Sequence, residues 1–564
     1  MTEAGILAEA GRREHRRITA PGGRPAWALL VVAIAALVAT PVLAVLVDGA
    51  GGLAAGGLPR GAGEMAVTTV LLMLLVGLGT LVIGGGLAWL VTAYRFPLRG
   101  ALVWLLVLPL AMPAYILGFV FLSIFDVTGP LQSALRSAFG PEVWVPEVRS
   151  LPGAALVLSL TLYPYVYLLA RNALLEHAAG TYEAARTLGA SRMRALWRVV
   201  LPMARPSLAA GLALVMMETL TDFATVQYFN VKTVSVGVYL VWKGSFDFAA
   251  ASQLSVVVLL FAVAVLAGER RLRGRARFHQ QGGRGRGIQP RILTGWQAWT
   301  ATGVGVSVLL AGFALPVTQL ALWAARGLHD GSASLVDPRF VDYLTNSLFV
   351  AVITALLCAA LAVMIAHGWR MGGRIGAFAA QLTTFGYAVP GAVIGIGVLL
   401  SFAHLDEALV RAGVPGGTGL LVTGSVAGVV YAYTVRFLAP AYQAVDASFA
   451  KISPSTTLSA LTLGASPVRV MGRVHLPLAR SGVAVALVLV VIDAVKELPI
   501  VLLLRPFGFT TLSVWVYDLA RENFWEQAAL PSLLIVTVAV APVLLLFRQV
   551  RRAESHSTDG KVDR

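Results

Sequence analysis

The 564-residue sequence has few charged residues and almost no cysteine. Only 13% of its residues are charged and 57% are hydrophobic, whereas soluble domains carry about 25% charged residues. The apolar residues also come in long unbroken blocks. Together these features exclude a soluble globule, a disordered chain, collagen and a coiled coil. The composition predicts an all-α integral membrane protein.

Other shortages exclude classes of site. The single cysteine, Cys358, rules out a disulfide framework and a multi-thiolate metal centre. The eight histidines, including His367 and His475 near the expected cytoplasmic face, show no metal-ligand spacing. None of the few lysines stands in the Gly-x4-Gly-Lys-Ser/Thr context of a phosphate-binding loop. We therefore expect no enzyme activity of its own, no cofactor and no certain metal site.

About twelve segments are long and apolar enough for membrane helices, each of which needs about 20 residues. They are 26–47, 66–94, 101–125, 151–170, 204–226, 249–267, 298–325, 343–366, 376–403, 418–438, 481–504 and 529–547. The first follows a charged and polar N-terminal stretch and lacks a clean cleavage site. It is therefore expected to be an uncleaved helix and not a signal peptide.

Basic residues gather on one side of these spans. With a cytoplasmic N-terminus, the segments 1–25, 95–99, 171–205, 270–291, 370–374, 436–480 and 548–564 face the cytoplasm and hold 33 of the 44 lysines and arginines. Positive loops favour the cytoplasmic side, so both termini are predicted there. Topology thus accounts for the net charge of +16, and no nucleic-acid partner is needed to explain it.

The chain contains an internal repeat. RTLGAS (186–191) returns as LTLGAS (461–466), and RVVLPMAR (198–205) returns as RVHLPLAR (473–480), both at a sequence offset of 275. Pro113 and Pro390 correspond at an offset of 277 and are expected to kink the third and ninth spans. The repeat predicts two tandem six-helix halves, 1–268 and 296–552, joined by a basic linker, 269–295, and followed by a cytoplasmic tail, 553–564.

The best-preserved part of the repeat is a cytoplasmic loop, 171–205 in the first half and 440–480 in the second. In the first copy a helix containing Glu183, Ala184 and Ala185 is expected to end at Gly189, and a second helix then runs to Leu201 and Pro202. Two short helices joined by a tight turn would form a rigid knob. A knob that occurs twice predicts a partner with two sockets.

This pattern, Glu-Ala-Ala-x3-Gly-x9-Val-x-Leu-Pro, resembles the coupling-loop signature of ABC importer permeases, the membrane subunits of binding-protein-dependent transporters. Two fused halves, together with the segments 217–233 and 496–536, are similar to the ferric-iron group of that family. The resemblance implies a type I importer-like fold in the inner membrane of a bacterium. It also implies two copies of a separate ATPase subunit that binds ATP, an extracytoplasmic or lipid-anchored binding protein, and contact with membrane lipid.

The second loop departs from the signature. Leu458 stands where the first copy has Glu183, whereas Gly464, Leu476 and Pro477 are kept. In the family the glutamate is thought to pair with a basic residue of the ATPase. Two interpretations are open: coupling is asymmetric, with the first half holding its ATPase more tightly, or packing alone suffices at the second loop.

Ionisable residues within membrane spans are candidates for function. Glu218 and Asp222 lie in the fifth span, and Asp493 and Glu497 occupy the equivalent positions of the eleventh, at the repeat offset of 275. Spaced i, i+4, each pair is expected on one helix face. Tyr163, Tyr228 and Tyr431 are further oxygen donors for a hard cation. These groups either line a path for ferric iron or cap helices, pair with Lys496 or Arg505, and contact the binding protein.

The sequence thus predicts the permease of an ATP-driven importer, with ferric iron as the expected cargo. Thiamine or a polyamine is the alternative cargo for the same architecture. An ATP-independent secondary transporter also has twelve helices in parallel halves, and a membrane scaffold is a third class. The repeated cytoplasmic loop argues against a secondary transporter, and a scaffold leaves the duplicated kinks and acids without a purpose.

Overall fold

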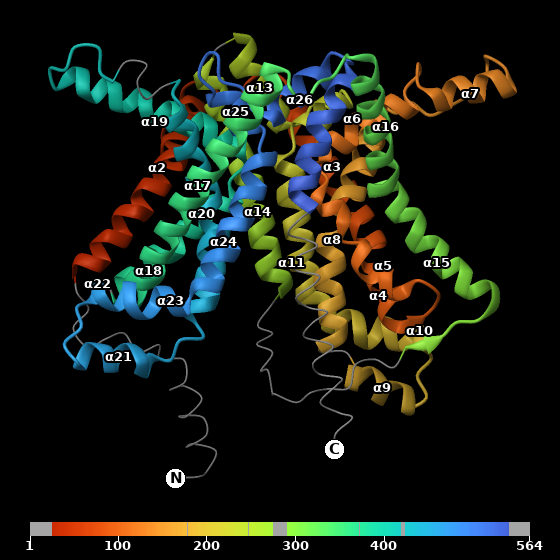
Figure 1. Cartoon of the computed structure of the whole chain (residues 1–564), viewed down its shortest axis with the longest axis horizontal. Helices are drawn as coiled ribbons and strands as arrows, with labels where there is room; N and C mark the ends of the chain where they lie inside the picture. Colours follow the sequence, from red (N-terminus) through yellow and green to blue (C-terminus); the bar gives the residue numbers. More distant parts are fainter. Residues whose placement is uncertain are drawn as a thin grey trace.

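The computed structural model describes residues 25–176, 179–245, 247–273, 290–371, 373–418 and 424–540 as a bundle of helices (Figure 1). The elements up to residue 273 are α2 (Pro25–Gly56), α3 (Ala62–Thr80), η1 (Leu81–Gly85), α4 (Gly86–Ala93), β1 (Tyr94–Arg95), α5 (Arg99–Leu105), η2 (Leu108–Ala111), α6 (Ala114–Phe125), α7 (Pro130–Phe139), α8 (Leu151–Glu176), α9 (Ala179–Thr187), α10 (Arg192–Ala195), η3 (Leu196–Val200), α11 (Leu201–Thr221), α12 (Ala224–Tyr228), α13 (Val234–Ser245) and α14 (Phe248–Arg273).

The elements after residue 290 follow a similar order. They are β2 (Arg291–Ile292), α15 (Gly295–Leu309), η4 (Leu310–Ala314), α16 (Leu315–Asp330), α17 (Pro338–Met371), α18 (Gly373–Leu382), η5 (Thr383–Ala388), α19 (Gly391–Arg411), α20 (Val426–Phe449), α21 (Pro454–Thr462), α22 (Pro467–Val470), η7 (Met471–His475), α23 (Leu476–Leu478), α24 (Arg480–Lys496), α25 (Pro499–Leu504) and α26 (Leu512–Arg521). A last apolar helix covers Trp525–Val540. The short strands β1 and β2 pair in parallel and join the start of the second half to a loop of the first.

The all-α membrane fold is confirmed. Within the described residues, nine helices are long and apolar enough to cross a membrane, or ten when the bent pair Pro467–Leu478 and Arg480–Lys496 counts as one span. Of the other expected spans, 418–438 falls on α20, which carries Arg436 and Asp446 and is less apolar than the nine. The expected span 529–547 is described only as far as Val540.

Two predicted kinks are confirmed. The third expected span is interrupted before Pro113 and the ninth before Pro390, and both prolines have an extended backbone, with ψ of 137° and 141°. A proline lacks the N–H that would continue the helical hydrogen bonds. Each expected span is therefore broken at its proline, and an α-helix, α6 or α19, begins directly after it.

The backbone repeats at the spacing of the sequence. Gly189 and Gly464 have φ of 86° and 83°, and the π-helical turns η3 and η7 are related by the same sequence offset of 275 as these two glycines. The first residues of α8 and α20, Leu151 and Val426, are related by this offset too. The same local folding thus occurs twice, while the exact boundaries of the two halves, with most of the linker outside the described residues, remain a prediction.

The first helix of each half packs on the other half. Helix α2 contacts α17, α18 and α19, while α15 and α16 with η4 contact α5, α6 and α8. The contact between α2 and α19 is close, since a Cβ atom on Gly397 would lie 2.2 Å from the carbonyl oxygen of Pro41. The hydroxyl of Tyr431 on α20 donates to the carbonyl of Leu37 on α2, at 2.7 Å. This exchange ties the two halves into one bundle.

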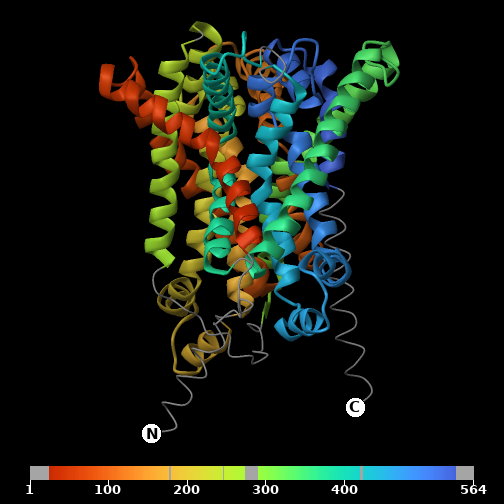
Figure 2. The ribbon, with the colours of Figure 1, turned by 90° about the vertical axis from the view of Figure 1, so that its left-hand side faces the viewer.

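The repeated loops lie at one end of the bundle. Figures 1 and 2 both place α9 and α10 on one side of this end and α21 and α22 on the other. The helices α13, α25 and α26 lie at the opposite end (Figure 1). The two knobs therefore face the same side of the membrane, as the repeat predicts for parallel halves.

Candidate functional site

A cavity of about 150 Å³ opens where α11 and α24 end. All four predicted carboxylates line it: Glu218 and Asp222 from the first half, and Asp493 and Glu497 from the second. It is walled by α6, α8, α11 and α12 on one side and by α20, α24 and α25 on the other. The structure thus brings together four acids that the sequence holds in two distant pairs.

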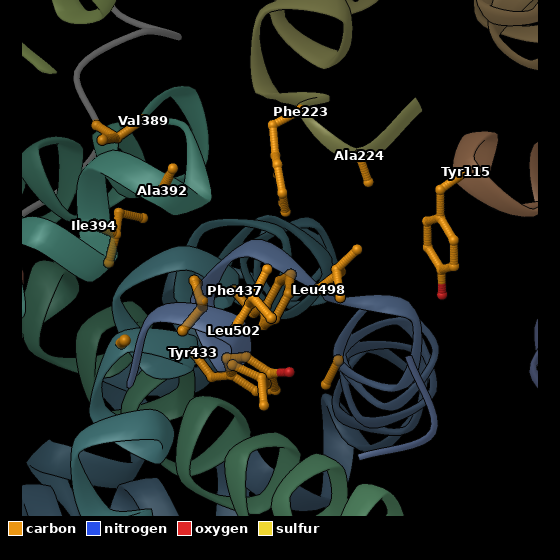
Figure 3. Packing of buried hydrophobic residues seen from close by; sticks show 14 of the residues in the cluster. Tyr115, Phe223, Ala224, Val389, Ala392, Ile394, Tyr433, Phe437, Leu498 and Leu502 are labelled. Carbon is orange, nitrogen blue, oxygen red and sulfur yellow. The ribbon is translucent and has the colours of Figure 1, made fainter. Parts of the chain in front are cut away.

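The two walls are equivalent position by position. Seven pairs of lining residues are related by the repeat offset of 275: Thr161 and Arg436, Leu162 and Phe437, Glu218 and Asp493, Thr221 and Lys496, Asp222 and Glu497, Phe223 and Leu498, Ala224 and Pro499. Figure 3 shows Phe223 and Ala224 on one segment, with Phe437 and Leu498 across from them. The cavity therefore lies between the halves and is built from both.

Asp222 and Glu497 each lie between a long helix and a short one that begins two residues later. Helix α11 ends at Thr221 and α24 ends at Lys496, and the next residue has an extended backbone, with ψ of 114° at Asp222 and 128° at Glu497. The expectation that each acid pair shares one continuous helix face is therefore wrong, because the helix stops before the second acid. The walls nevertheless present both acids of each pair to the cavity.

Both carboxylates accept hydrogen bonds from the backbone three residues ahead. Asp222 accepts from the N–H of Thr225 at 2.9 Å and from its hydroxyl at 2.7 Å. Glu497 accepts from the N–H of Ile500 at 3.4 Å. Capping is thus a function of both acids, as one of the two open interpretations predicts. It leaves part of each carboxylate available, because a carboxylate has about four acceptor positions.

Two bases occupy only the second-half wall. Arg436 Nε lies 3.3 Å from Glu497 Oε2, and both side chains are buried. Lys496 Nζ lies 2.8 Å from Asp493 Oδ1, one turn earlier on α24. Gly391 makes room for the first pair, since a Cβ there would lie 2.7 Å from Glu497 and 2.8 Å from Arg436. The acids of this wall therefore have basic partners of their own.

The first-half wall has threonine in place of each base. Thr161 corresponds to Arg436 and Thr221 to Lys496. Among the described residues no lysine, arginine or histidine forms an ion pair with Asp222. With four acids and two bases lining the cavity, its formal charge is −2, and the first-half wall contributes two acids and no base of its own.

The predicted tyrosines do not line the cavity. Tyr163 donates its hydroxyl to the carbonyl of Leu106 at 2.8 Å, and Tyr431 donates to Leu37 on α2. Tyr228 donates to the carbonyl of Tyr517 at 3.2 Å. Tyr163 and Tyr431 thus do not belong to this cavity, and their place on the pathway stays a prediction. Their hydroxyls bind backbone carbonyls because they point between helices.

Two other tyrosines line the cavity instead, Tyr115 on α6 and Tyr165 on α8. Tyr115 is 5% exposed, and no group of the described residues forms a hydrogen bond with its hydroxyl. Figure 3 shows its ring extending from α6 toward the space beside Leu498. Sequence reasoning missed Tyr115, since nothing in its neighbourhood of apolar residues marks it.

The prediction that Arg436 belongs to the cytoplasmic segment 436–480 is wrong. It lies within α20 and is buried against Glu497. The sequence does contain a signal for this site. Arg436 lies inside the predicted span 418–438 and corresponds to Thr161 of the first half, so it is an intramembrane charge that only one half has.

Within the described residues no group of three or more histidine, cysteine, aspartate or glutamate side chains is arranged to hold a metal ion. His367 and His475, which the sequence does not connect, meet with their Nδ1 atoms 2.9 Å apart. His475 Nε2 also lies 2.9 Å from Thr457 Oγ1. These contacts join α17 to the second knob through η7.

The first knob consists of α9, α10 and η3, and the second of α21, α22 and η7. Ala184 and Ala185 lie on α9, and the side chain of Glu183 on the same helix is outside the described residues. Leu201 and Pro202 begin α11, and Leu476 and Pro477 begin α23. Gly189 and Gly464 have the left-handed backbone that a sharp turn requires.

Both knobs expose apolar side chains at equivalent positions. Leu188 and Leu463, beside the turn glycines, are 88% and 87% exposed. Met193 and Val468, which follow the turns, are each 63% exposed. Large exposed apolar residues at corresponding places on two knobs mark surfaces for a protein partner. Leu458, at the position of Glu183, is half-buried.

Comparison with known proteins agrees with this architecture. Residues 80–268 match the family described as the binding-protein-dependent transport system inner membrane component. The Fe(3+)-transport system permease protein FbpB 2 of Haemophilus influenzae is 25% identical over 487 residues, which cover 86% of this chain and 89% of that protein. The ferric transport system permease protein FbpB of Actinobacillus pleuropneumoniae is 21% identical over 485 residues, or 81% and 67% of the two chains.

A shorter relative is closer in sequence. The sulfate transport system permease protein CysW of Escherichia coli is 30% identical over 214 residues, covering 35% of this chain and 70% of that protein. A family match over a membrane-spanning region and these relatives agree with the repeated knobs and the all-helical bundle. The chain belongs to the family of inner membrane components of binding-protein-dependent transport systems.

Proposed function

We propose that this permease imports ferric iron, which an extracytoplasmic binding protein delivers. The observation that carries the proposal is the cavity between the halves, where four carboxylates meet two bases. Carboxylate oxygens are the ligands that hard cations prefer. Two of the relatives that cover most of this chain are named as iron permeases, and both align across more than one half.

The cavity favours a cation over an oxyanion. Its excess negative charge would repel sulfate, the cargo named for the shorter relative. Thiamine and polyamines are also cations, so charge alone does not separate them from iron. Uptake measurements with each of these cations distinguish them from iron.

The two knobs support the proposal of two ATPase subunits. Each knob combines a rigid turn with an exposed leucine, and both project from the same end of the bundle (Figures 1 and 2). We take this end as cytoplasmic, together with both termini, because of the distribution of basic residues. ATP would be bound by the partner subunits, and this chain would need no cofactor. The binding protein would dock at the opposite end, in the bacterial periplasm or from a lipid anchor.

ATP-dependent uptake into proteoliposomes tests the proposed cargo. The permease would be reconstituted with its ATPase subunits and an iron-loaded binding protein, and uptake of radiolabelled ferric iron would be measured beside thiamine, spermidine and sulfate. We expect uptake of iron only, dependent on ATP. Uptake of thiamine or spermidine without iron would keep the transporter architecture and reject iron as the cargo.

A variant connects uptake to the cavity. Asp222→Asn removes one negative charge of the first-half wall and is expected to lower iron uptake by about tenfold, the equivalent of about 1.4 kcal/mol. Asp330→Asn, an exposed aspartate at the end of α16, is the matched control. Equal uptake by both variants would contradict a role for the cavity.

A further inference from the structure

The cavity has charge for a cation but lacks a set of groups that would chelate one. Four carboxylates line it, yet within the described residues no three histidine, cysteine, aspartate or glutamate side chains are arranged to hold a metal ion. A hard cation without its water takes six or more oxygen ligands at about 2.0–2.6 Å. The described walls therefore do not replace the inner ligands of a metal ion.

The cavity has room for a cation that keeps its ligands. Its volume is about 150 Å³, and one water molecule occupies about 30 Å³ in the liquid. Several waters or other small ligands therefore fit around an ion in this cavity. The charge and the volume of the cavity are thus suited to an ion surrounded by its own small ligands.

The charge that attracts such an ion is on the first-half wall. Asp222 forms no ion pair within the described residues, and its two bonds to Thr225 leave acceptor positions free. In the second half, Glu497 and Asp493 are paired with Arg436 and Lys496. A cation in the cavity thus meets a carboxylate without a basic partner at Asp222, whereas the carboxylate of Glu497 already has one.

The hydroxyl of Tyr115 is a second, independent feature of the same wall. It is buried, it lines the cavity, and no described residue forms a hydrogen bond with it. Burying a polar group without a partner is costly. A water or ammine ligand of a cation would donate a hydrogen bond to this oxygen. The second half has Ala392 at the corresponding position, directly after the glycine that follows Pro390, so this group too belongs to one half only.

We propose that the cargo crosses this cavity as a compact multivalent cation that keeps its own shell of water or small ligands, held at the first-half wall by Asp222 and Tyr115. Glu218, on the same wall, adds negative charge. Arg436 and Lys496 keep the acids of the second-half wall occupied. The inference rests on the proposed function in taking a metal cation as the cargo, and it adds the form in which that cation passes.

Two trivalent probes test it. Hexaamminecobalt(III) does not exchange its ligands, so it binds only through them, whereas terbium(III) exchanges its waters and can bind carboxylates directly. Dissociation constants would be measured by titration calorimetry on the complete permease–ATPase complex in lipid nanodiscs, without ATP or binding protein. We expect both probes to bind with similar affinity. Terbium binding without hexaamminecobalt binding would overturn the proposal, because it would show direct coordination.

Variants locate the binding to one wall. Asp222→Asn is expected to weaken both probes by about tenfold and Tyr115→Phe by about threefold, or about 1.4 and 0.7 kcal/mol. The pair Thr161→Arg with Ala114→Gly copies Arg436 and Gly391 onto the first half and should remove binding. Thr161→Val with Ala114→Gly is its control. Unchanged affinity in Asp222→Asn, or loss in the control as large as with arginine, would overturn the assignment to the first-half wall.

The outcome is separable from that of the proposed function. Iron uptake by a complex that binds neither probe would keep the proposed cargo and reject this form of passage. Binding of both probes with the expected dependence on Asp222, by a complex that imports no iron, would support the cavity as a site for a shielded cation and reject ferric iron as the cargo.

Discussion

At the scale of single residues, Arg436 and Glu497 show how one half has changed relative to the other. Three corresponding positions differ together: Arg436 stands in place of Thr161, Glu497 in place of Asp222, and Gly391, directly after the conserved kink proline of the repeat, in place of Ala114. The arginine supplies a partner, the longer acid reaches it, and the glycine leaves space for both. This concerted difference indicates a built ion pair of the second half.

We predict that replacing Arg436 alone lowers the stability of the protein strongly, whereas replacing Arg436 and Glu497 together lowers it little. Arg436→Thr leaves Glu497 buried without its cation and should destabilise the protein by about 3–5 kcal/mol. Arg436→Thr with Glu497→Asp recreates the first-half residues and should recover most of that loss. Thermal unfolding of the complex in nanodiscs measures both. A double variant as unstable as the single one would contradict this prediction. It would show that the ion pair itself stabilises the protein, and that the loss in Arg436→Thr does not come from leaving Glu497 unpaired.

The sequence identified the four acids but not their surroundings. Charges inside apolar spans are visible without a structure, and the repeat relates one pair to the other. The direction of a tyrosine side chain depends on the rotation of its helix, so Tyr163 and Tyr115 could not be told apart as cavity residues. The sequence does not reveal Arg436 as a cavity residue, because it lies directly beside the predicted end of the tenth span.

At the scale of elements, the exchange of first helices depends on close backbone contact. Gly397 on α19 faces the backbone of Pro41 on α2, and a Cβ at this position would lie 2.2 Å from the carbonyl oxygen and 2.7 Å from the carbonyl carbon. Backbone atoms cannot move aside as the end of a flexible side chain can. Small residues at such crossings let helices approach in a membrane.

Gly397→Ala is therefore predicted to separate α2 from α19. The cost of inserting a methyl group into a packed contact is about 1–3 kcal/mol, and it should appear as a lower unfolding temperature. Gly303→Ala on α15 is the control, since a Cβ there meets no atom within 4 Å. Equal unfolding temperatures for the two variants would show that the α2–α19 contact yields without cost.

Sequence patterns predict where the helices lie along the chain better than they predict which helices pack against each other. Apolar length and the prolines at 113 and 390 sufficed for most spans and for both breaks. The end of α11 before Asp222 could not be predicted, because no glycine or proline follows it. The end of α24 does have a signal, since Pro499 lies three residues beyond Lys496. The packing of α2 on the other half is a long-range contact, for which the apolar pattern of one helix holds no information.

At the scale of the whole molecule, the two knobs differ in construction while sharing a surface. The first continues into the membrane as one unbroken helix, Met193–Thr221, whereas the second meets its membrane helix at an angle of 76° after Leu478. The second is joined to α17 through His475 and His367. Both nevertheless expose a leucine beside the turn glycine. The loss of the glutamate at Leu458 thus leaves the apolar docking surface in place.

We therefore predict that both knobs transmit the work of ATP hydrolysis. Leu188→Asp and Leu463→Asp each place a charge in a docking surface without disturbing the fold, because both side chains are almost fully exposed. Burial of a leucine side chain contributes about 1.5–3 kcal/mol, so each change should lower ATP-dependent uptake by at least about tenfold. Leu335→Asp, an exposed leucine in the loop between α16 and α17, is the control. Normal uptake with Leu463→Asp and loss only with Leu188→Asp would contradict this prediction and show that the first knob alone carries the coupling. The absence of the glutamate from the second knob would then explain the difference.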